Sequence, residues 1–294
     1  MRSLLLTTLI ASLGGCALFP GQPDRADLLT IATWNVEHLA ERNDSGCRPR
    51  QDPDYAALAA HVAAVRPEIV ALQEVESEAA AYRVFDPQDY VVVLEERPGG
   101  GPRAECRGLA GLYLNRQAVG FAIRRDVMFV RHPDLAELSL DDPNLRSGVD
   151  ITVNPVGAEP IRLLAVHLKS GCSSGDRSEA CDTLFRQVPV VERWIDARAS
   201  AGESFAVLGD FNRRLATPGD AVWSEWDDGA PLGADLTLAS GAEQAGCDPR
   251  YPAFIDHIVL GARAGGRLIR FEEITYSGEG LSDHCLVLAE LDAS

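Results

Sequence analysis

Four short apolar segments of this sequence run directly into acids, amides or a histidine, and this pattern constrains the fold more than any other feature. The segments are TIATWNVE (30–37), IVALQE (69–74), LLAVHLKS (163–170) and FAVLGDFN (205–212). Apolar runs of this length bounded by polar residues predict buried strands. A buried acid or amide costs free energy unless a partner satisfies it. We therefore expect packed strands whose ends bring these polar groups together.

Two segments near the C-terminus carry the same kinds of residue. FIDHIVL (254–260) holds Asp256, and LSDHCLVL (281–288) holds Asp283 and His284 at the start of its strand. One polar residue at a strand end usually meets only water, but a cluster of acids, amides and histidines provides the oxygen ligands that Mg²⁺ prefers beside a substrate phosphate. Zinc-type spacing such as H-E-x-x-H does not occur. The cluster therefore predicts a hard cation rather than zinc.

The remaining pattern predicts many strands and few helices. A helix is expected over 52–67, with Pro53 in its first turn and Pro67 ending it, and a second over about 178–200, which Pro189 either kinks or divides. Further strands are expected at 28–36, 90–96, 111–115, 120–125, 127–132, 148–153 and 284–291. Strands and helices in this mixed order predict an α/β layered sandwich whose sheets are each covered on one face.

Length and charge limit the organisation and the partners. The chain has 294 residues, of which 46% are hydrophobic, enough for one sizeable core. Its formal net charge of −17 argues against a surface that coats nucleic acid by neutralising phosphates. This negative charge is still compatible with a small site that binds phosphate through a bound cation.

The N-terminus predicts export. Residues 1–15 have one basic residue and an apolar run too short to span a bilayer, as in a secretory signal peptide. LGGC (13–16) resembles a bacterial lipobox, which implies lipidation of Cys16, a tether over 16–27 and an outer-membrane or periplasmic location. Plain signal cleavage and secretion, with Cys16 incidental, is the alternative. Residues 28–294 are then a single domain.

Export changes the interpretation of the other cysteines. They form an even set in an oxidising compartment, which favours three disulfides over a metal site without C-x-x-C spacing. Cys172 and Cys181 close a short polar loop and are the preferred pair. Connectivity does not follow from sequence, so Cys47–Cys106 and Cys247–Cys285 are guesses for the remaining four.

The ordered motifs TWNVE, LQEV, HLKS, LGDFNR, IDHI and SDH resemble those of the endonuclease/exonuclease/phosphatase superfamily, which has the deoxyribonuclease I-like fold. The resemblance covers about residues 28–294. It implies a four-layered α/β sandwich, with two packed mixed β-sheets and helices on the outer faces. It also implies a metal-dependent phosphoric ester hydrolase, and a monomer.

The resemblance assigns roles to individual residues. Metal ligation is implied for Asn35, Glu74 and Asp283, with Asn35 alternatively holding a phosphate oxygen. Catalytic roles are implied for His167, Asp210, Asn212, Asp256 and His284. Asp210 would position or deprotonate the attacking water, His167 would donate to the phosphate or leaving oxygen, and Asp256 would orient His284. The division of acid and base roles stays open, and Glu95 is a weaker candidate partner for His167.

The expected function is Mg²⁺-dependent hydrolysis of a phosphodiester, with nucleic acid as the first candidate substrate and Mn²⁺ or Ca²⁺ as alternative ions. A small or lipid phosphate, as in phosphatases and sphingomyelinases, is the first alternative. A catalytically inactive binding lipoprotein is the second. Every motif residue that catalysis would need is present in the sequence.

Overall fold

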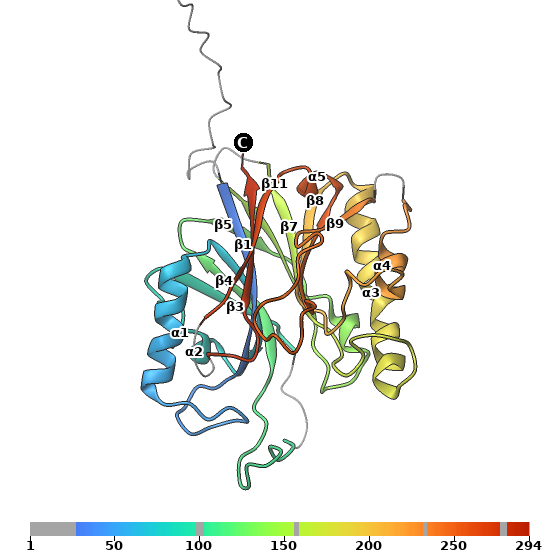
Figure 1. Ribbon diagram of the computed structural model, residues 1–294. Helices are drawn as coiled ribbons and strands as arrows, with labels where there is room; N and C mark the ends of the chain where they lie inside the picture. Colours follow the sequence, from blue (N-terminus) through green and yellow to red (C-terminus); the bar gives the residue numbers. More distant parts are fainter. Residues whose placement is uncertain (1–27, 98–102, 156–158, 232–233, 277–280, 294) are drawn as a thin grey trace, which may run out of the picture.

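The computed structural model describes residues 28–97, 103–155, 159–231, 234–276 and 281–293. The predicted signal peptide, the lipobox cysteine and the tether, residues 1–27, lie outside the described residues. Two mixed six-stranded sheets pack face to face (Figure 1). Across the described ranges, no helix combines the length and the apolar character needed to cross a bilayer.

The first sheet has the strand order β11-β12-β1-β2-β4-β3. Its strands are β1 (Leu28–Leu39), β2 (Ile69–Val75), β3 (Tyr90–Leu94), β4 (Ala118–Arg124), β11 (Leu268–Ile274) and β12 (Leu286–Asp292). The central strands β1 and β2 run parallel, so their carboxyl ends lie at the same edge. The first strand also pairs antiparallel with the last, from Leu28 opposite Asp292 to Thr33 opposite Val287.

The second sheet has the strand order β5-β6-β7-β8-β10-β9. Its strands are β5 (Met128–Arg131), β6 (Val149–Asn154), β7 (Ile161–His167), β8 (Ser204–Asp210), β9 (Leu236–Leu238) and β10 (Asp256–Gly261). The parallel pair here is β7 and β8, with His167 in register with Asp210. Asp256 lies directly opposite Asp210 in the antiparallel pair of β8 and β10. Each sheet therefore has a central parallel pair with polar residues at its carboxyl end.

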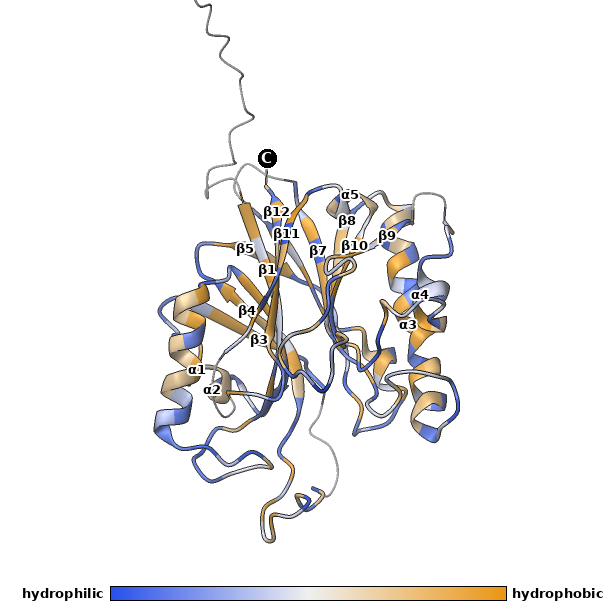
Figure 2. Cartoon of the chain, in the orientation of Figure 1, coloured by the Kyte–Doolittle hydropathy of each residue, from blue (hydrophilic) through white to orange (hydrophobic). Residues whose placement is uncertain are grey.

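Helices cover the outer faces and complete the predicted four layers, so the predicted fold class is confirmed. The first sheet is covered by α1 (Asp52–Val65) and α2 (Glu78–Ala81), and the second by α3 (Glu179–Ser200) and α4 (Ala221–Trp226) (Figure 1). The short helices η2 (Ala136–Ser139) and α5 (Ala262–Gly265) lie in connections. Apolar residues concentrate in the strands and hydrophilic residues in the loops (Figure 2).

Two local predictions need correction. The expected strand at 111–115 is wrong, because only a single bridge forms there, between Glu105 and Tyr113. Of the two alternatives for the helix over 178–200, its division at Pro189 is wrong, because α3 runs through Pro189 as one element. Its buried face, which includes Leu184 and Val191, packs on the second sheet and supports the helix across the missing hydrogen bond. Neither β11 nor α4 was predicted.

The three disulfides of the described residues are the three expected pairs: Cys47–Cys106, Cys172–Cys181 and Cys247–Cys285. The first joins two loops beside the first sheet, and the second joins the segment after β7 to the start of α3. The third joins the segment before β10, in the second sheet, to the residue just before β12, in the first. Only this third bond connects the two sheets.

Candidate active site

The carboxyl ends of the two central parallel pairs meet at one end of the sandwich, and Asn35 connects them. Its Nδ2 atom donates to Oε1 of Glu74 at 3.3 Å and to Oδ2 of Asp210 at 3.1 Å. Glu74 belongs to the first sheet and Asp210 to the second, so one buried amide holds a carboxylate from each. The Oδ1 atom of Asn35 accepts from the backbone N–H of Glu37 at 3.0 Å, which fixes the orientation of the amide.

The β1–β2 end of the site has an irregular backbone. Glu37, His38 and Glu74 have φ angles of 47°, 50° and 62°, in the left-handed region that side chains rarely adopt. This bend directs the His38 backbone N–H to Oε2 of Glu74 at 3.0 Å, and it places His38 Nδ1 3.4 Å from the same oxygen. Strained residues of this kind concentrate at functional sites, where the surrounding structure holds them in place.

The β7–β8 end places a histidine against an acid. The Nε2 atom of His167 lies 3.4 Å from Oδ2 of Asp210, and both side chains are almost fully buried. The backbone N–H of Asn212 donates to the other Asp210 oxygen at 2.8 Å, and the Asn212 amide donates to the Leu168 carbonyl. Gly209 permits the close approach of β7 and β8, because a Cβ atom at this position would lie 1.9 Å from the Val166 carbonyl oxygen.

Burial and neighbouring charges shift the protonation of this pair in opposite directions. Burial lowers the pKa of His167 well below its ordinary value, and the nearby Arg146 lowers it further. Burial also raises the pKa of Asp210, and the carboxylate of Asp256 raises it again. His167 is therefore neutral, and Asp210 holds its proton to a higher pH than an ordinary carboxyl group.

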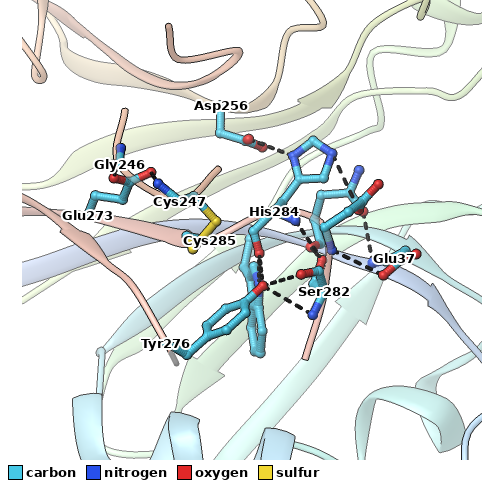
Figure 3. The surroundings of a disulfide bond; sticks show 12 residues. Glu37, Gly246, Cys247, Asp256, Glu273, Tyr276, Ser282, His284 and Cys285 are labelled. Carbon is cyan, nitrogen blue, oxygen red and sulfur yellow. Dashed lines mark hydrogen bonds and ion pairs between the residues drawn. A yellow bond between two sulfur atoms is a disulfide. The ribbon is translucent and has the colours of Figure 1, made fainter. Parts of the chain in front are cut away.

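A second histidine–carboxylate pair crosses between the sheets. The Nδ1 atom of His284 lies 2.6 Å from Oδ2 of Asp256 (Figure 3). Its Nε2 atom lies 3.9 Å from Oδ2 of Asp210. Burial alone would lower the pKa of His284, but the carboxylates of Asp256, Asp210 and Asp283 outweigh it and raise that pKa. The predicted orientation of His284 by Asp256 is present, and the charged imidazolium is the favoured form.

Asp283 lies at the rim. Its side chain is 67% exposed, and its Oδ1 atom lies 3.7 Å from Nε2 of His284. Its backbone N–H donates to Glu37 Oε2 at 3.1 Å, which ties the β12 entry to the β1 end. The structure thus brings together seven of the eight predicted site residues as a buried or half-buried group, with Asp283 beside it.

Sequence reasoning missed Arg146 and His38. Arg146 is buried before β6, and it interacts electrostatically with Glu74, Asp210 and Glu95. Burial lowers the pKa of Arg146, but these three carboxylates favour its charged form. No apolar run leads into Arg146, so the strand-end pattern carried no signal for it. The sequence carries no signal for His38 either, because the bend that turns it toward Glu74 is not visible there.

The suggested pairing of Glu95 with His167 is wrong. Both oxygens of Glu95 accept from the Arg97 guanidinium at 3.1 Å, and Oε2 also accepts from the Ser147 N–H at 2.8 Å. The Nδ1 atom of His167 is buried and has no hydrogen-bond partner among the described residues. Glu95 therefore stabilises the Arg97 loop instead.

The donor set fits a divalent cation. The carboxylates of Asp210 and Asp256 and the ring of His284 lie within 4.8 Å of one another, and Glu74 shares an amide with Asp210. Because the imidazole of His284 is charged and bonded to Asp256, the carboxylate oxygens are the available donors. The buried Oδ1 atom of Asp256 has no hydrogen-bond partner among the described residues. Buried acids at this spacing repel one another unless a cation or a proton neutralises them. Carboxylate and amide oxygens of this kind suit Mg²⁺, Mn²⁺ and Ca²⁺.

Two packed mixed sheets, with acids, amides and histidines clustered at the carboxyl ends of their central strands, define a metal-dependent phosphoric ester hydrolase. The chain belongs to the Endonuclease/Exonuclease/phosphatase family, whose model matches residues 32–284. No curated protein sequence gives a significant match.

Solved structures share the fold at low identity. A D. rerio TDP2 complexed with a single-strand DNA product has a TM-score of 0.62 and 17% identity over 90% of this chain and 98% of that one. The human Nocturnin catalytic domain with bound sulfate has a TM-score of 0.59 and 16% identity, covering 90% and 94%. A family protein from Bacteroides thetaiotaomicron also has a TM-score of 0.59 and 16% identity, covering 90% and 94%.

Proposed function

We propose that this chain is a divalent-metal-dependent phosphodiesterase, with Mg²⁺ as the first candidate ion. The observation that carries the proposal is the convergence of Glu74 and Asn35 from one sheet with His167 and Asp210 from the other. A structural ion-pair network would not need a neutral buried histidine beside an acid of raised pKa. Glu74 and Asp283, with Asn35, would hold the ion, and the ion would neutralise charge that develops on the phosphoryl group.

The protein's own residues supply the proton transfers. Asp210 accepts a proton from the attacking water, because its raised pKa makes it a better base than an ordinary carboxylate. His284, charged and held by Asp256, donates to the phosphoryl oxygens where negative charge builds up. The neutral His167 donates a hydrogen bond through Nε2–H to a phosphoryl oxygen, and the charged His284 gives its proton to the leaving oxygen as the phosphorus–oxygen bond breaks. The buried guanidinium of Arg146 adds a second positive charge facing the phosphate.

Nucleic acid is the first candidate substrate within this proposal. A TDP2 of the same fold is solved with a single-strand DNA product, which supports a polynucleotide. The formal net charge of −17 instead favours a small or lipid phosphodiester, because a long polyanion would be repelled. Both substrate classes contain the same phosphodiester group, so the site chemistry serves either.

A substrate panel tests the proposal. Purified protein is incubated with plasmid DNA, single-stranded DNA, RNA, sphingomyelin and inositol phosphates, each with Mg²⁺, Mn²⁺, Ca²⁺ or EDTA. We expect hydrolysis of at least one phosphodiester with a divalent ion and none with EDTA. Activity that survives EDTA, or that never appears although the protein is folded, contradicts the proposal. Hydrolysis of sphingomyelin alone selects the second substrate class, whereas hydrolysis of the inositol phosphates alone, which are monoesters, would contradict a phosphodiesterase.

We also propose that the protein is exported and anchored by a lipid on Cys16. Three disulfides suit an oxidising compartment and support export. Cell fractionation tests the anchor: the wild type should sediment with membranes, whereas Cys16→Ser should appear in the soluble fraction. Identical fractionation of the two proteins would contradict lipidation.

A further inference from the structure

The His284–Asp256 pair depends on the spacing between the two sheets. His284 precedes β12 in the first sheet, and Asp256 begins β10 in the second. A small relative shift of the sheets would therefore lengthen the 2.6 Å contact directly. Other catalytic contacts within one sheet, such as His167 to Asp210, are fixed by strand register instead.

The Cys247–Cys285 disulfide lies beside this pair and crosses the same gap (Figure 3). Cys285 follows His284 directly and is buried. Cys247 lies in the loop that leads into Asp256 nine residues later. The bond therefore links the backbone next to the histidine with the segment that delivers its carboxylate.

Noncovalent contacts hold the same loop against the first sheet. The carboxylate of Glu273, on β11, accepts from the backbone N–H groups of Gly246 at 2.6 Å and Cys247 at 3.3 Å. The rings of Phe254 and Phe271 meet edge to face with centroids 5.4 Å apart. The loop before β10 is thus docked on β11 and covalently tied to the entry of β12.

The histidine backbone is held by a separate set of contacts. The His284 carbonyl accepts from Trp34 Nε1 at 3.1 Å and from the Tyr276 hydroxyl at 2.7 Å. The His284 N–H donates to Ser282 Oγ, which in turn donates to the Asn35 carbonyl at 2.7 Å. All of these partners belong to the first sheet or its connections. They fix His284 within its own sheet and leave its position relative to Asp256 to the contacts across the gap.

We propose that the Cys247–Cys285 disulfide is a positioning element that fixes the spacing between His284 and Asp256. The other two disulfides each lie within one half of the sandwich and do not act on this distance. Breaking the Cys247–Cys285 bond leaves the fold and the substrate contacts in place but releases the pair from its catalytic geometry. The kinetic test of this role rests on the proposed function. The spectroscopic test of the His284–Asp256 hydrogen bond rests on the geometry alone.

The other disulfides provide a matched control. Cys47–Cys106 spans 59 residues and Cys247–Cys285 spans 38. Loop-closure entropy depends on the logarithm of that length. Removing either bond should therefore raise the conformational entropy of the unfolded chain by a similar amount. We compare Cys247→Ala/Cys285→Ala with Cys47→Ala/Cys106→Ala and with the wild type. The two variants should have similarly lowered melting temperatures, and assays are run well below both.

The kinetic test uses bis(p-nitrophenyl) phosphate with Mg²⁺ or Mn²⁺. We expect Cys247→Ala/Cys285→Ala to lower kcat about tenfold or more with KM changed less than about twofold, because misplaced catalytic groups slow the chemical step. The control variant should keep the wild-type kcat. Equal kcat values for both variants would overturn the proposal. If the wild type does not hydrolyse this diester, the kinetics are measured on a substrate that the panel identifies; if no diester of the panel is hydrolysed, the proposed function fails and the next measurement still decides.

That measurement is the proton resonance of the His284–Asp256 hydrogen bond. In metal-free protein with ¹⁵N-labelled histidine, a short bond to a carboxylate gives a far-downfield Nδ1–H signal, which His284→Ala assigns by its absence. The signal should be present in the control variant and shifted or lost in Cys247→Ala/Cys285→Ala. An unchanged signal in the latter overturns the proposal.

Graded reduction covers the case in which the variants do not fold. Dithiothreitol transfers two electrons and two protons to each disulfide, giving two cysteine thiols and the cyclic disulfide of the reagent. Alkylation and mass spectrometry then report which bonds are reduced, while activity and the downfield signal are measured on the same samples. Their loss should follow Cys247 and Cys285; loss that follows Cys47 and Cys106 instead would contradict the proposal.

Discussion

The Nε2 atom of His167 lies 3.4 Å from Oδ2 of Asp210, and the two residues are in register on neighbouring parallel strands. Because both strands end there, the pair needs no long loop to form. Gly209 makes the close approach of the strands sterically feasible. The strand register therefore sets the distance between the proposed base, Asp210, and the neutral imidazole of His167.

Asp210→Asn should lower kcat by about 10²–10⁴-fold, the range typical of a lost general base. The melting temperature should change little, because an uncharged amide of the same shape is less costly to bury than a carboxylate. Kinetics and thermal unfolding measure the two effects. Asp150→Asn is the control: Asp150 is equally buried but binds Arg162 and Trp194 away from the site, so this variant should lose stability and keep kcat. A large stability loss in Asp210→Asn would make Asp210 structural.

Glu74→Gln should weaken divalent-ion binding by more than the 10–100-fold typical of an outer-shell partner, because it removes a carboxylate charge from the site. Isothermal titration with Mg²⁺ and Mn²⁺ measures the affinity. Glu68→Gln is the matched control, since Glu68 lies just before the same strand at its opposite end and accepts from the Thr30 N–H. Equal affinity in wild type and Glu74→Gln would remove Glu74 from the metal site.

Arg146→Met should lower kcat/KM by about 10²-fold, comparable with the loss of one preorganised donor to a developing oxyanion. The guanidinium is buried among acids, and its Nε atom has no hydrogen-bond partner among the described residues, so its charge remains available to a phosphate. Arg162→Met, which breaks a pair with Asp150 outside the site, should leave kcat/KM within about twofold of wild type. Equal effects of the two substitutions would show that Arg146 acts only on stability.

Glu192→Gln should raise stability at high pH. Burial, and then the neighbouring Asp196, raises the pKa of Glu192 from 4.5 to about 7. The folded state therefore binds more protons between these values, and the free energy of unfolding falls as the pH rises through this window. The melting temperature of Glu192→Gln should be roughly 2 °C above that of the wild type at pH 8, and the difference should be smaller at pH 5. Glu179→Gln, an exposed position at the start of the same helix, should show no such dependence.

The sequence predicted the sandwich and most of its site because the relevant residues end regular strands. Asp210, His167 and Glu74 follow apolar runs whose period and length indicate buried strands. His38 and Arg146 could not be found this way. His38 depends on a bend with positive φ angles, and Arg146 on the folding of an irregular segment before β6. The sequence favoured Cys172–Cys181 because the two residues close a short loop. The other two pairs were guesses that the structure confirms, because disulfide connectivity depends on tertiary contacts that the sequence does not show.

The pairing of the first strand with the last has a consequence for how activity arises during biosynthesis. Leu28 lies opposite Asp292, so β1 cannot complete its hydrogen bonding until nearly the whole domain has left the ribosome. His284 enters the site on that same closing strand. A polypeptide that ends before this strand thus has Glu74 and Asp210 without the imidazole that faces Asp210, and the proposed hydrolysis waits for the strand that closes the first sheet.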